Sequence, residues 1–393
     1  MISVGEADRL LQSLLPEPET ELVPLALAAG RLLAEPLKAD RDGPPYDRVA
    51  MDGYAVSSTP ALRSWKIVGF QAAGHPPLPP GDIGTAVEVA TGAVLPEGRD
   101  TVIPYERTVR EDGWVTLNDG LPLMLPMAHV HRQGTDYKEG DVLLTVGSRL
   151  TSPRLHSLAA EGCDPVPVIR RAVWSIAATG DELVAIKTKT KPKPWQIRRS
   201  NAAAIAGEAA TWGLSPAGQT VLPDDREKLR QGIETLLAAA PDLLVLTGGV
   251  SAGALDLVPA VLADLGAETV FHQIAQRPGK PLWCGRVVRG RPTVVFGLPG
   301  NPVSSLFAFR RYVLPWLLAF EGREPAARLP LHPLDVKTLD LKPGYTVFLP
   351  WSEAKGALEW KGSGDFSALS ESTGFVEVSE DAAVKYFPWG GTT

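Results

Sequence analysis

The chain has 393 residues, of which 44% are hydrophobic and 21% charged, a composition typical of a globular protein with about two to four domains. Its net charge of −6 gives no cationic field for nucleic acid, and no apolar run is long enough to span a membrane. Because no signal-peptide pattern is visible and neither Cys163 nor Cys284 has a CxxC partner, we expect a cytoplasmic protein without a disulfide framework or a zinc site.

The first part of the sequence predicts a short helix followed by β structure. Ser3 and Glu6 have the spacing of a capping box, and the apolar residues behind them recur at helical intervals as far as Pro16. Between residues 65 and 146, short alternating runs are separated by Asp-Gly turns, which predicts a β-rich domain. A second short helix is expected to start at Ser152.

Strands and helices alternate from Ala172 to about Phe320, and this alternation predicts a parallel sheet with right-handed crossovers. Strand-like runs in this region end in loops rich in glycine and hydroxyl groups, namely TGDE (179–182), TGGVSAG (247–253) and GLPGNPVSS (297–305). In such sheets ligands bind beyond the carboxyl ends of the strands, where these loops lie. After Phe320 the pattern returns to β, which predicts a small C-terminal barrel or sandwich.

The three loops together predict a site for an anionic ligand. Glycine lets backbone N–H groups approach a ligand closely, and a helix N-terminus behind each loop favours negative charge. The alternative is that all three are ordinary turns between strands and helices. The sequence has neither a P-loop motif nor a dinucleotide-binding fingerprint, which argues against a nucleoside triphosphatase and against a dehydrogenase.

Charged residues in the predicted loops indicate how an anion would be held. Carboxylates beside a phosphate site commonly bind Mg²⁺, although acids that precede a helix also act as N-caps. Two cations flank a turn in RPGK (277–280), an arrangement suited to a tetrahedral oxyanion. The basic loop KTKTKPKPW (187–195) is either a solvated insertion or a docking patch for an anionic partner. The acids at such loop positions are Asp52, Glu182, Asp224, Asp225 and Asp256.

Several longer motifs are similar to those of a known family. The stretch PPYDRVAMDGYAV (44–56) is long and specific, and so is GLPGNPVSS in the last glycine-rich loop. Together with shorter motifs they follow the family's order over nearly the whole chain, which resembles molybdopterin molybdenumtransferase, the MoeA family that also includes the gephyrin E domain. The shorter motifs are ATGAVLPEGRDTVIPYE (90–106), TGDEL (179–183), RRSN (198–201), LTGGVSAG (246–253), RPGKP (277–281) and, more weakly, GSGDFSALS (362–370).

The resemblance implies a multidomain fold with α/β and β parts, assembled as an elongated homodimer. An N-terminal wedge domain would comprise residues 1–50 and 139–170, with a β-rich domain at 51–138 inserted into it. A doubly wound, molybdopterin-binding-like α/β domain would follow at 171–320, and a C-terminal β-barrel domain at 321–393. The active site would lie between the α/β domain of one subunit and other domains of its partner.

The reaction implied by the resemblance is the insertion of molybdate into adenylylated molybdopterin, with Mg²⁺-dependent cleavage of the adenylate and release of AMP. An upstream molybdopterin adenylyltransferase would supply the adenylylated substrate. Transferred by position, the catalytic residues would be Asp52, Glu182, Asp225, Asp256 and Lys280, with Glu182 and Asp256 also binding the metal. The substrate-binding residues would be Thr91, Gly248, Gly249, Ser251, Arg277, Ser304 and Ser363.

The resemblance also assigns a ligand to several of these residues. Gly248, Gly249 and Ser251 would cradle the pterin phosphate. Lys280 and Ser304 would hold molybdate, while Ser363 would reach in from the barrel.

The sequence departs from the family pattern at three positions. Arg277 stands where the family usually has lysine, His131 replaces the first arginine of an RRxGxD motif, and Pro350 occupies the position of an arginine in the barrel. Proline cannot bind an oxyanion, so we expect oxyanion binding to depend on Arg277, Lys280 and the lysines of residues 187–195. The alternatives are a paralogue of the same fold that uses tungstate or has reduced activity, and a pterin-binding scaffold without turnover.

Overall fold

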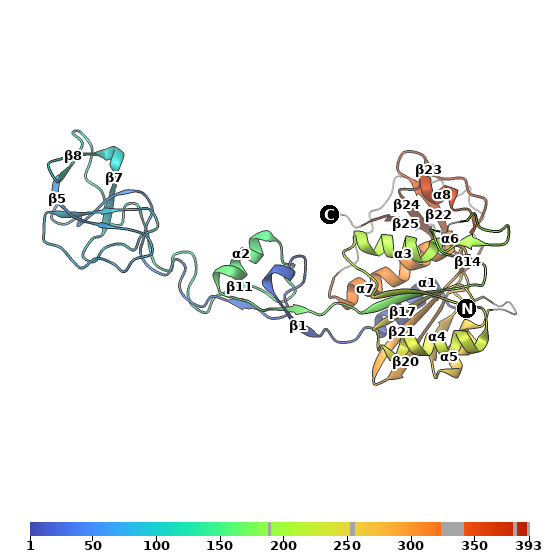
Figure 1. Ribbon diagram of the computed structural model, residues 1–393. Helices are drawn as coiled ribbons and strands as arrows, with labels where there is room; N and C mark the ends of the chain where they lie inside the picture. The colour runs from blue at the N-terminus through green and yellow to red at the C-terminus, as the bar shows by residue number, and fades with distance from the viewer. Residues whose placement is uncertain (188–189, 252–255, 324–341, 380–382, 391–393) are drawn as a thin grey trace. The chain divides into compact units, whose positions relative to one another are not determined.

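The computed structural model describes residues 1–187, 190–251, 256–323, 342–379 and 383–390. Contacts divide the chain into two compact units, shown in Figure 1. Unit 1 comprises residues 1–19 and 169–393, and unit 2 comprises residues 20–168. None of the helices formed by the described residues has the length and hydropathy of a membrane span.

Unit 1 is built around a six-stranded sheet. Its order is β16 (Gly218–Leu222), β13 (Trp174–Thr179), β17 (Leu243–Thr247), β21 (Arg291–Leu298), β20 (Trp283–Arg289) and β18 (Glu268–His272). All five residues of β17 are buried, as expected for a central strand with both faces covered. β16, β13, β17 and β21 run parallel to one another, in agreement with the alternation of strands and helices in the sequence.

The expectation of a wholly parallel sheet is wrong at one edge. β20 is antiparallel to β21, and β18 is antiparallel to β20. Gly290 separates β20 from β21 and has a φ of +83°, a conformation that glycine adopts without steric cost. The chain therefore reverses in a tight hairpin here and does not cross over through a helix.

Helices cover both faces of this sheet, which confirms the doubly wound arrangement of the α/β part (Figure 1). On one face, apolar residues of α4 (Arg226–Ala238) and α5 (Val258–Asp264) pack against β17 and β21. The other face is covered by α3 (Ser200–Thr211), α6 (Pro302–Ala308) and α7 (Leu314–Phe320), with the π-helical turn Phe309–Val313 between the last two.

The helix predicted at the N-terminus, α1 (Val4–Ser13), is confirmed, and it joins the core of unit 1. The Ser3 hydroxyl accepts a hydrogen bond from the Glu6 N–H at 3.1 Å, as the capping-box pattern predicts. Asp8 on α1 forms a bidentate ion pair with Arg311, with N–O distances of 2.6 and 2.9 Å. Arg311 also bonds Glu377, so this buried guanidinium joins three separate segments of unit 1.

The C-terminal part of unit 1 forms a second sheet, which packs on α6 through aromatic side chains. Its order is β19 (Gln276–Arg277), β22 (Thr346–Ser352), β24 (Gly374–Val378) and β25 (Val384–Pro388), with β23 (Gly356–Ala357) paired to β22. The rings of Phe307 on α6 and Phe375 on β24 are stacked with centroids 4.3 Å apart. α8 (Ser367–Glu371) precedes β24. Closure of these strands into a barrel stays a prediction.

Unit 2 contains a second six-stranded sheet. Tyr54 of this sheet lies opposite Glu88 and packs edge-on against Tyr105, with ring centroids 5.3 Å apart. The strand order is β7 (Thr101–Pro104), β4 (Gly53–Val56), β6 (Thr85–Val89), β5 (Ser64–Gln71), β9 (Trp114–Leu117) and β8 (Thr108–Glu111), and the 3₁₀ turn Tyr105–Arg107 follows β7.

The rest of unit 2 brings its two ends together through short strands and α2 (Ser152–Ala160), which starts where the sequence predicts. Their shared core contains Leu33 and Leu37 from one end and Leu158 and Val168 from the other. The four domain boundaries expected from the family resemblance stay predictions. The short strands pair as β1 (Thr20–Val23) with β12 (Val166–Ile169), β2 (Leu37–Lys38) with β11 (Val142–Leu144), and β3 (Arg48–Val49) with β10 (Val130–His131), and a 3₁₀ turn spans Leu25–Leu27.

Candidate active site

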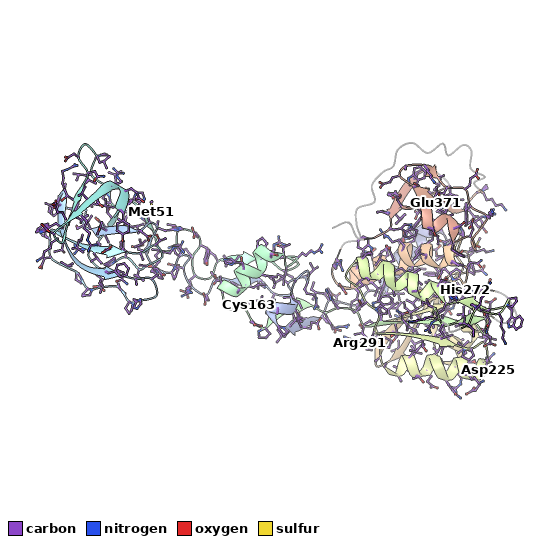
Figure 2. All side chains as sticks on the ribbon, turned by 45° about the horizontal axis from the view of Figure 1, so that its top comes forward. Met51, Cys163, Asp225, His272, Arg291 and Glu371 are labelled. Atoms are coloured by element: carbon purple, nitrogen blue, oxygen red, sulfur yellow. The ribbon has the colours of Figure 1, made fainter. Side chains whose placement is uncertain are left out.

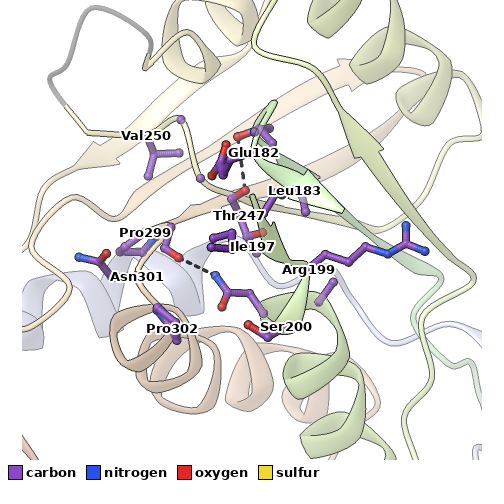
Figure 3. Close-up of a pocket in the computed structure, with 18 of the residues that line it drawn as sticks. Glu182, Leu183, Ile197, Arg199, Ser200, Thr247, Val250, Pro299, Asn301 and Pro302 are labelled. Carbon is purple, nitrogen blue, oxygen red and sulfur yellow. Dashed lines mark hydrogen bonds between the residues drawn. The ribbon is translucent and has the colours of Figure 1, made fainter. Parts of the chain in front are cut away.

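The three glycine-rich loops meet at one edge of the sheet in unit 1. They follow β13, β17 and β21, whose parallel carboxyl ends bring Thr179, Thr247 and Leu298 to the same edge. The loops line a cavity of about 760 Å³, which we call the loop pocket (Figure 3). The N-terminal turn of α3 and the short parallel pair β14 (Leu183–Val184) and β15 (Ile197–Arg198) complete its wall.

Two glycines allow the loops after β13 and β17 to approach each other. Gly248 and Gly249 have φ values of +92° and +65°, which are unfavourable for most other residues. A Cβ atom at Gly248 would lie 2.8 Å from the Thr179 carbonyl oxygen, so a side chain would force the two loops apart. Gly248, Gly249 and Ser251, which were expected to cradle a phosphate, all line the loop pocket.

The loop pocket also contains carboxylates from three segments, namely Glu182, Asp224 and Asp256. Burial raises the pKa of Asp224 above its usual value, and the nearby charges of Asp181 and Asp256 raise it further. Two reciprocal hydrogen bonds hold the Asp224 loop. The Asp181 N–H donates to the Asp224 carboxylate at 3.4 Å, and the Asp224 N–H donates to the Asp181 carboxylate at 3.2 Å.

Asp225, an expected catalytic residue, is not among the residues that line the loop pocket. Its carboxylate accepts a hydrogen bond from the Lys228 N–H at 2.9 Å and caps α4, and Figure 2 shows it at the start of that helix. The sequence left catalysis and capping open for both acids of the Asp-Asp pair. The structure assigns the pocket wall to Asp224 and the helix cap to Asp225.

A second cavity, of about 730 Å³, adjoins the loop pocket and is lined by positively charged side chains. Its charged lining residues are Arg277, Lys280 and Lys361, and none of the lining residues that the structure describes is an acid. We call it the cation pocket. It shares Pro281, Pro299 and Asn301 with the loop pocket, so the two cavities adjoin each other along the GLPGNP loop.

The expected molybdate residues Ser304 and Ser363 both line the cation pocket. Ser304 lies on α6 and is 3% exposed. Ser363 comes from the C-terminal part of the chain, and its hydroxyl accepts a hydrogen bond from the Asn301 side-chain amide at 2.8 Å. Its carbonyl oxygen accepts a second hydrogen bond from the Val303 N–H at 3.1 Å, so the two segments are joined at the pocket.

Lys361 was not identified from the sequence. The weak GSGDFSALS motif begins one residue later, at Gly362, and so leaves the lysine outside the quoted match. Its position before Ser363 is the one signal in the sequence that would have indicated it.

The remaining two expected site residues, Asp52 and Thr91, belong to unit 2. The Asp52 carboxylate accepts hydrogen bonds from the Thr91 N–H at 2.6 Å and from the Thr91 hydroxyl at 2.8 Å. These bonds favour the charged form and hold the pKa of Asp52 below its usual value, with the backbone bond as the larger cause. Thr91 thus fixes Asp52 as an anion in one orientation.

Replacing Thr91 with valine is expected to raise the pKa of Asp52 part of the way to its usual value, because the N–H bond remains while the hydroxyl bond is lost. A lowered carboxyl pKa stabilises the fold above the pKa of the unfolded chain, and this contribution disappears as pH falls through the folded-state pKa. With a higher folded-state pKa in the variant, this contribution to stability is therefore lost at a higher pH than in the wild type. The pKa of Asp52 is measured by ¹³C NMR titration of the aspartate carboxyl carbons, and the Asp52 signal is assigned from its absence in Asp52→Asn.

Thr91→Ser is the matched control for this titration because it keeps the hydroxyl group. Its Asp52 titration is expected to follow the wild type. An unchanged Asp52 titration in Thr91→Val would contradict the role given to the hydroxyl bond.

Comparison with known proteins identifies the family. Residues 2–162 match the MoeA N-terminal region (domain I and II), and residues 175–319 match the probable molybdopterin binding domain. The chain is 34% identical to a molybdopterin molybdenumtransferase of Synechocystis over 98% of its own length and 97% of the relative's. The chain belongs to the molybdopterin molybdenumtransferase family. It is therefore a transferase, and it acts in molybdenum cofactor biosynthesis.

Two further proteins are similar to this chain over nearly its whole length. The Haemophilus influenzae relative is 32% identical, over 97% of this chain and 95% of its own. A solved MoeA protein of Pyrococcus horikosii has a TM-score of 0.76 and 31% identity, and the match covers 99% of this chain and 97% of that one. The fold is thus a MoeA-like arrangement of several sheets and helices.

The structure places two of the three departures from the MoeA pattern in unrelated environments. In unit 2, the imidazole of His131 lies between Asp136, at 2.9 Å, and Arg48, at 3.1 Å. Pro350 lies opposite Phe375 in the C-terminal sheet and is buried. Neither residue is among those that line the two pockets of unit 1, in the part of the chain that the structure describes.

The third departure, Arg277, lines the cation pocket. The basic loop 187–195 extends from the wall of the loop pocket, and its residues 188 and 189 lie outside the described residues. Within this loop, Lys193 lies over the Trp195 ring, with the ammonium 5.4 Å from the ring centroid. None of the described residues from 187 to 195 lines either pocket, so the expected help of these lysines in oxyanion binding stays a prediction.

Proposed function

We propose that the chain inserts molybdate into adenylylated molybdopterin and releases AMP in a Mg²⁺-dependent reaction. The supporting observation is the adjacency of the two pockets of unit 1. The loop pocket offers backbone N–H groups and carboxylates, the cation pocket offers three positive charges, and the GLPGNP loop forms part of both. A phosphorylated substrate and a tetrahedral oxyanion would thus be bound side by side.

In this proposal the loop pocket binds the pterin phosphate and the adenylate. The Gly248 N–H is already bonded to the Leu298 carbonyl oxygen at 2.9 Å, so the backbone donors of this turn would be the N–H groups that follow Gly248, and Ser251 adds a hydroxyl. The N-terminal turn of α3 supplies further N–H groups and Ser200. These donors would orient the phosphate groups next to the carboxylates.

Glu182 and Asp256 are the proposed Mg²⁺ ligands. Among the described residues, no group of three or more His, Cys, Asp or Glu side chains has the arrangement of a metal site. Mg²⁺ nevertheless often binds through one or two carboxylates together with substrate phosphates and water, so the carboxylates of the loop pocket fit a site that the substrate completes. When bound, Mg²⁺ would neutralise charge on the phosphate.

The cation pocket is the proposed molybdate site. Arg277 and Lys280 supply charge, and Ser304 and Ser363 supply hydroxyl groups to the oxyanion. The Arg277–Lys280 turn is held by Gln276, whose side-chain amide donates to the Gly279 carbonyl oxygen at 3.0 Å. This support would fix the two cations relative to the loop pocket.

Lys280→Ala is expected to reduce molybdate-dependent formation of active cofactor by about tenfold or more, because it removes a charged hydrogen-bond donor from the oxyanion. The purified protein is mixed with adenylylated molybdopterin, Mg²⁺ and molybdate, and AMP and active cofactor are measured. Lys342→Ala is the control, since Lys342 lines neither pocket. Unchanged cofactor synthesis by Lys280→Ala, in this assay or in complementation, would remove Lys280 from the site.

The same assay separates the two alternatives. A preference for tungstate over molybdate would indicate a paralogue of different metal specificity. Binding of adenylylated molybdopterin without AMP release would indicate a scaffold.

We also propose that the chain works as a cytoplasmic homodimer in which Asp52 and Thr91 take part in the reaction, with adenylylated molybdopterin supplied by an upstream adenylyltransferase. The proposal rests on the family resemblance and on the paired geometry of Asp52 and Thr91. Light scattering after size-exclusion chromatography measures the assembly, and a mass of one chain would exclude the homodimer.

A further inference from the structure

The cation pocket contains one charged residue to which no role has been given, Lys361. It lies between β23 and α8, in the segment that carries Ser363, and its side chain lines the pocket together with Arg277 and Lys280. Among the described residues none of these three side chains forms an ion pair, and the pocket lining that the structure describes has no carboxylate. Three positive side chains therefore line one cavity, while the Asp365 carboxylate, which interacts electrostatically with Lys361, lies outside its lining.

Hydrogen bonds hold the backbone at and just after Lys361. The Lys361 N–H donates to the Asp365 carboxylate at 2.9 Å, and the same carboxylate accepts a hydrogen bond from the Ser367 N–H at 3.1 Å. Two residues after Lys361, Ser363 is bonded to both Asn301 and Val303 of the GLPGNPVSS loop. The position of the lysine at the pocket is thus set by the fold, while its exposed side chain keeps the freedom to reach a ligand.

Among the residues that the structure describes, no other charged residue of the C-terminal part of the chain lines the pocket. β22 contributes Val347 and Leu349, which are apolar, and Pro350 of the same strand is buried and does not line the pocket. The neighbouring Trp360 is aromatic. Any positive charge that this part presents to a bound anion therefore comes from Lys361.

Like charges in one cavity repel each other, and a bound anion with two negative charges removes this repulsion. We propose that Lys361 is an oxyanion-binding residue of the cation pocket, where it binds a tetrahedral oxodianion such as molybdate together with the two cations of the RPGK turn. The inference rests on the proposed function, because it assigns a third cation to the same molybdate site. It also explains how this chain supplies charge from its C-terminal part although Pro350 has none.

The test is calorimetric titration of the full-length protein with molybdate at low ionic strength. Lys361→Ala is expected to weaken binding by about three- to tenfold, the effect of one exposed charge on a divalent anion. Lys361→Arg is expected to bind within about twofold of the wild type, because it keeps the positive charge of an exposed side chain. The loss in Lys361→Ala should shrink as salt is added, because exposed charges are screened.

Two further variants make the outcome specific. Lys280→Ala reports on the pocket itself, and Lys342→Ala reports on the loss of an exposed lysine outside it. No molybdate binding by the wild type, or wild-type affinity in Lys280→Ala, would overturn the proposed molybdate site and with it the inference. Weaker binding by Lys280→Ala combined with wild-type affinity of Lys361→Ala would overturn the inference alone, as would a Lys361→Arg variant that binds as weakly as Lys361→Ala.

Discussion

Replacing Arg311 with methionine is expected to lower the free energy of unfolding of unit 1 by about 3–5 kcal/mol, the usual cost of removing one partner of a buried ion pair. The Arg311 side chain is 1% exposed and bonds the carboxylates of Asp8 and Glu377. Burial alone would lower the pKa of Arg311, but the bonds and charges of these two acids raise it above its usual value. The guanidinium is thus fully charged, and its loss leaves Glu377 buried, with Lys385 at 3.6 Å as its one remaining ion-pair partner among the described residues.

Urea denaturation followed by tryptophan fluorescence measures the effect, because Trp174, Trp283 and Trp316 are buried in unit 1. The double variant Arg311→Met/Glu377→Gln is expected to recover a large part of the loss, since it removes the unpaired charge. Arg286→Met, which breaks the exposed pair with Glu268, is the matched control, expected to cost about 1 kcal/mol or less. Equal decreases in the free energy of unfolding for Arg311→Met and Arg286→Met would contradict the buried-charge explanation.

Asp256→Asn is expected to reduce AMP release by roughly 100-fold or more, the effect commonly seen when a group that stabilises charge in an active site is removed. The substitution keeps the size of the side chain but removes the negative charge next to Glu182 and Asp224 in the loop pocket. In the proposed function this charge helps to hold Mg²⁺ at the adenylate phosphate. Single-turnover release of AMP, with Mg²⁺ varied over a wide range, measures both the rate and the metal requirement.

Asp264→Asn is the control for Asp256→Asn, because Asp264 lies at the end of α5 and pairs with Arg226 on the surface. Asp225→Asn belongs in the same series, since asparagine also caps helices well and leaves α4 intact. A 100-fold loss in Asp225→Asn would support its catalytic role over the helix cap seen in the structure. Wild-type AMP release by Asp256→Asn would remove Asp256 from the reaction.

Local sequence patterns predicted much of the α/β part. The capping box at Ser3 agrees with α1, and the alternation of strands and helices after Ala172 agrees with α3 and α4 on either side of β16. Each depends on interactions within a few residues, which a sequence displays directly. The convergence of the three glycine-rich loops also followed, because parallel strands place their carboxyl ends at one edge.

The features that the sequence did not predict depend on contacts between distant residues. The strand WCGRVVR (283–289) has the composition of a strand, but its antiparallel pairing depends on the conformation of Gly290. Asp224 and Asp225 have the same chemistry, and the direction in which α4 starts decides which one lines the pocket. Lys361 becomes a pocket residue only through the hydrogen bonds between Ser363 and the GLPGNPVSS loop.

The packing of α1 in unit 1 has a consequence for synthesis of the chain. Asp8 and Arg311 are 303 residues apart in sequence, and unit 2 lies between them as the continuous segment 20–168. The ribosome therefore synthesises every residue of unit 2 before it has made the sheet on which α1 packs. Unit 2 is able to fold while translation continues, whereas the first helix keeps its apolar face unburied until the segment around Arg311 has emerged.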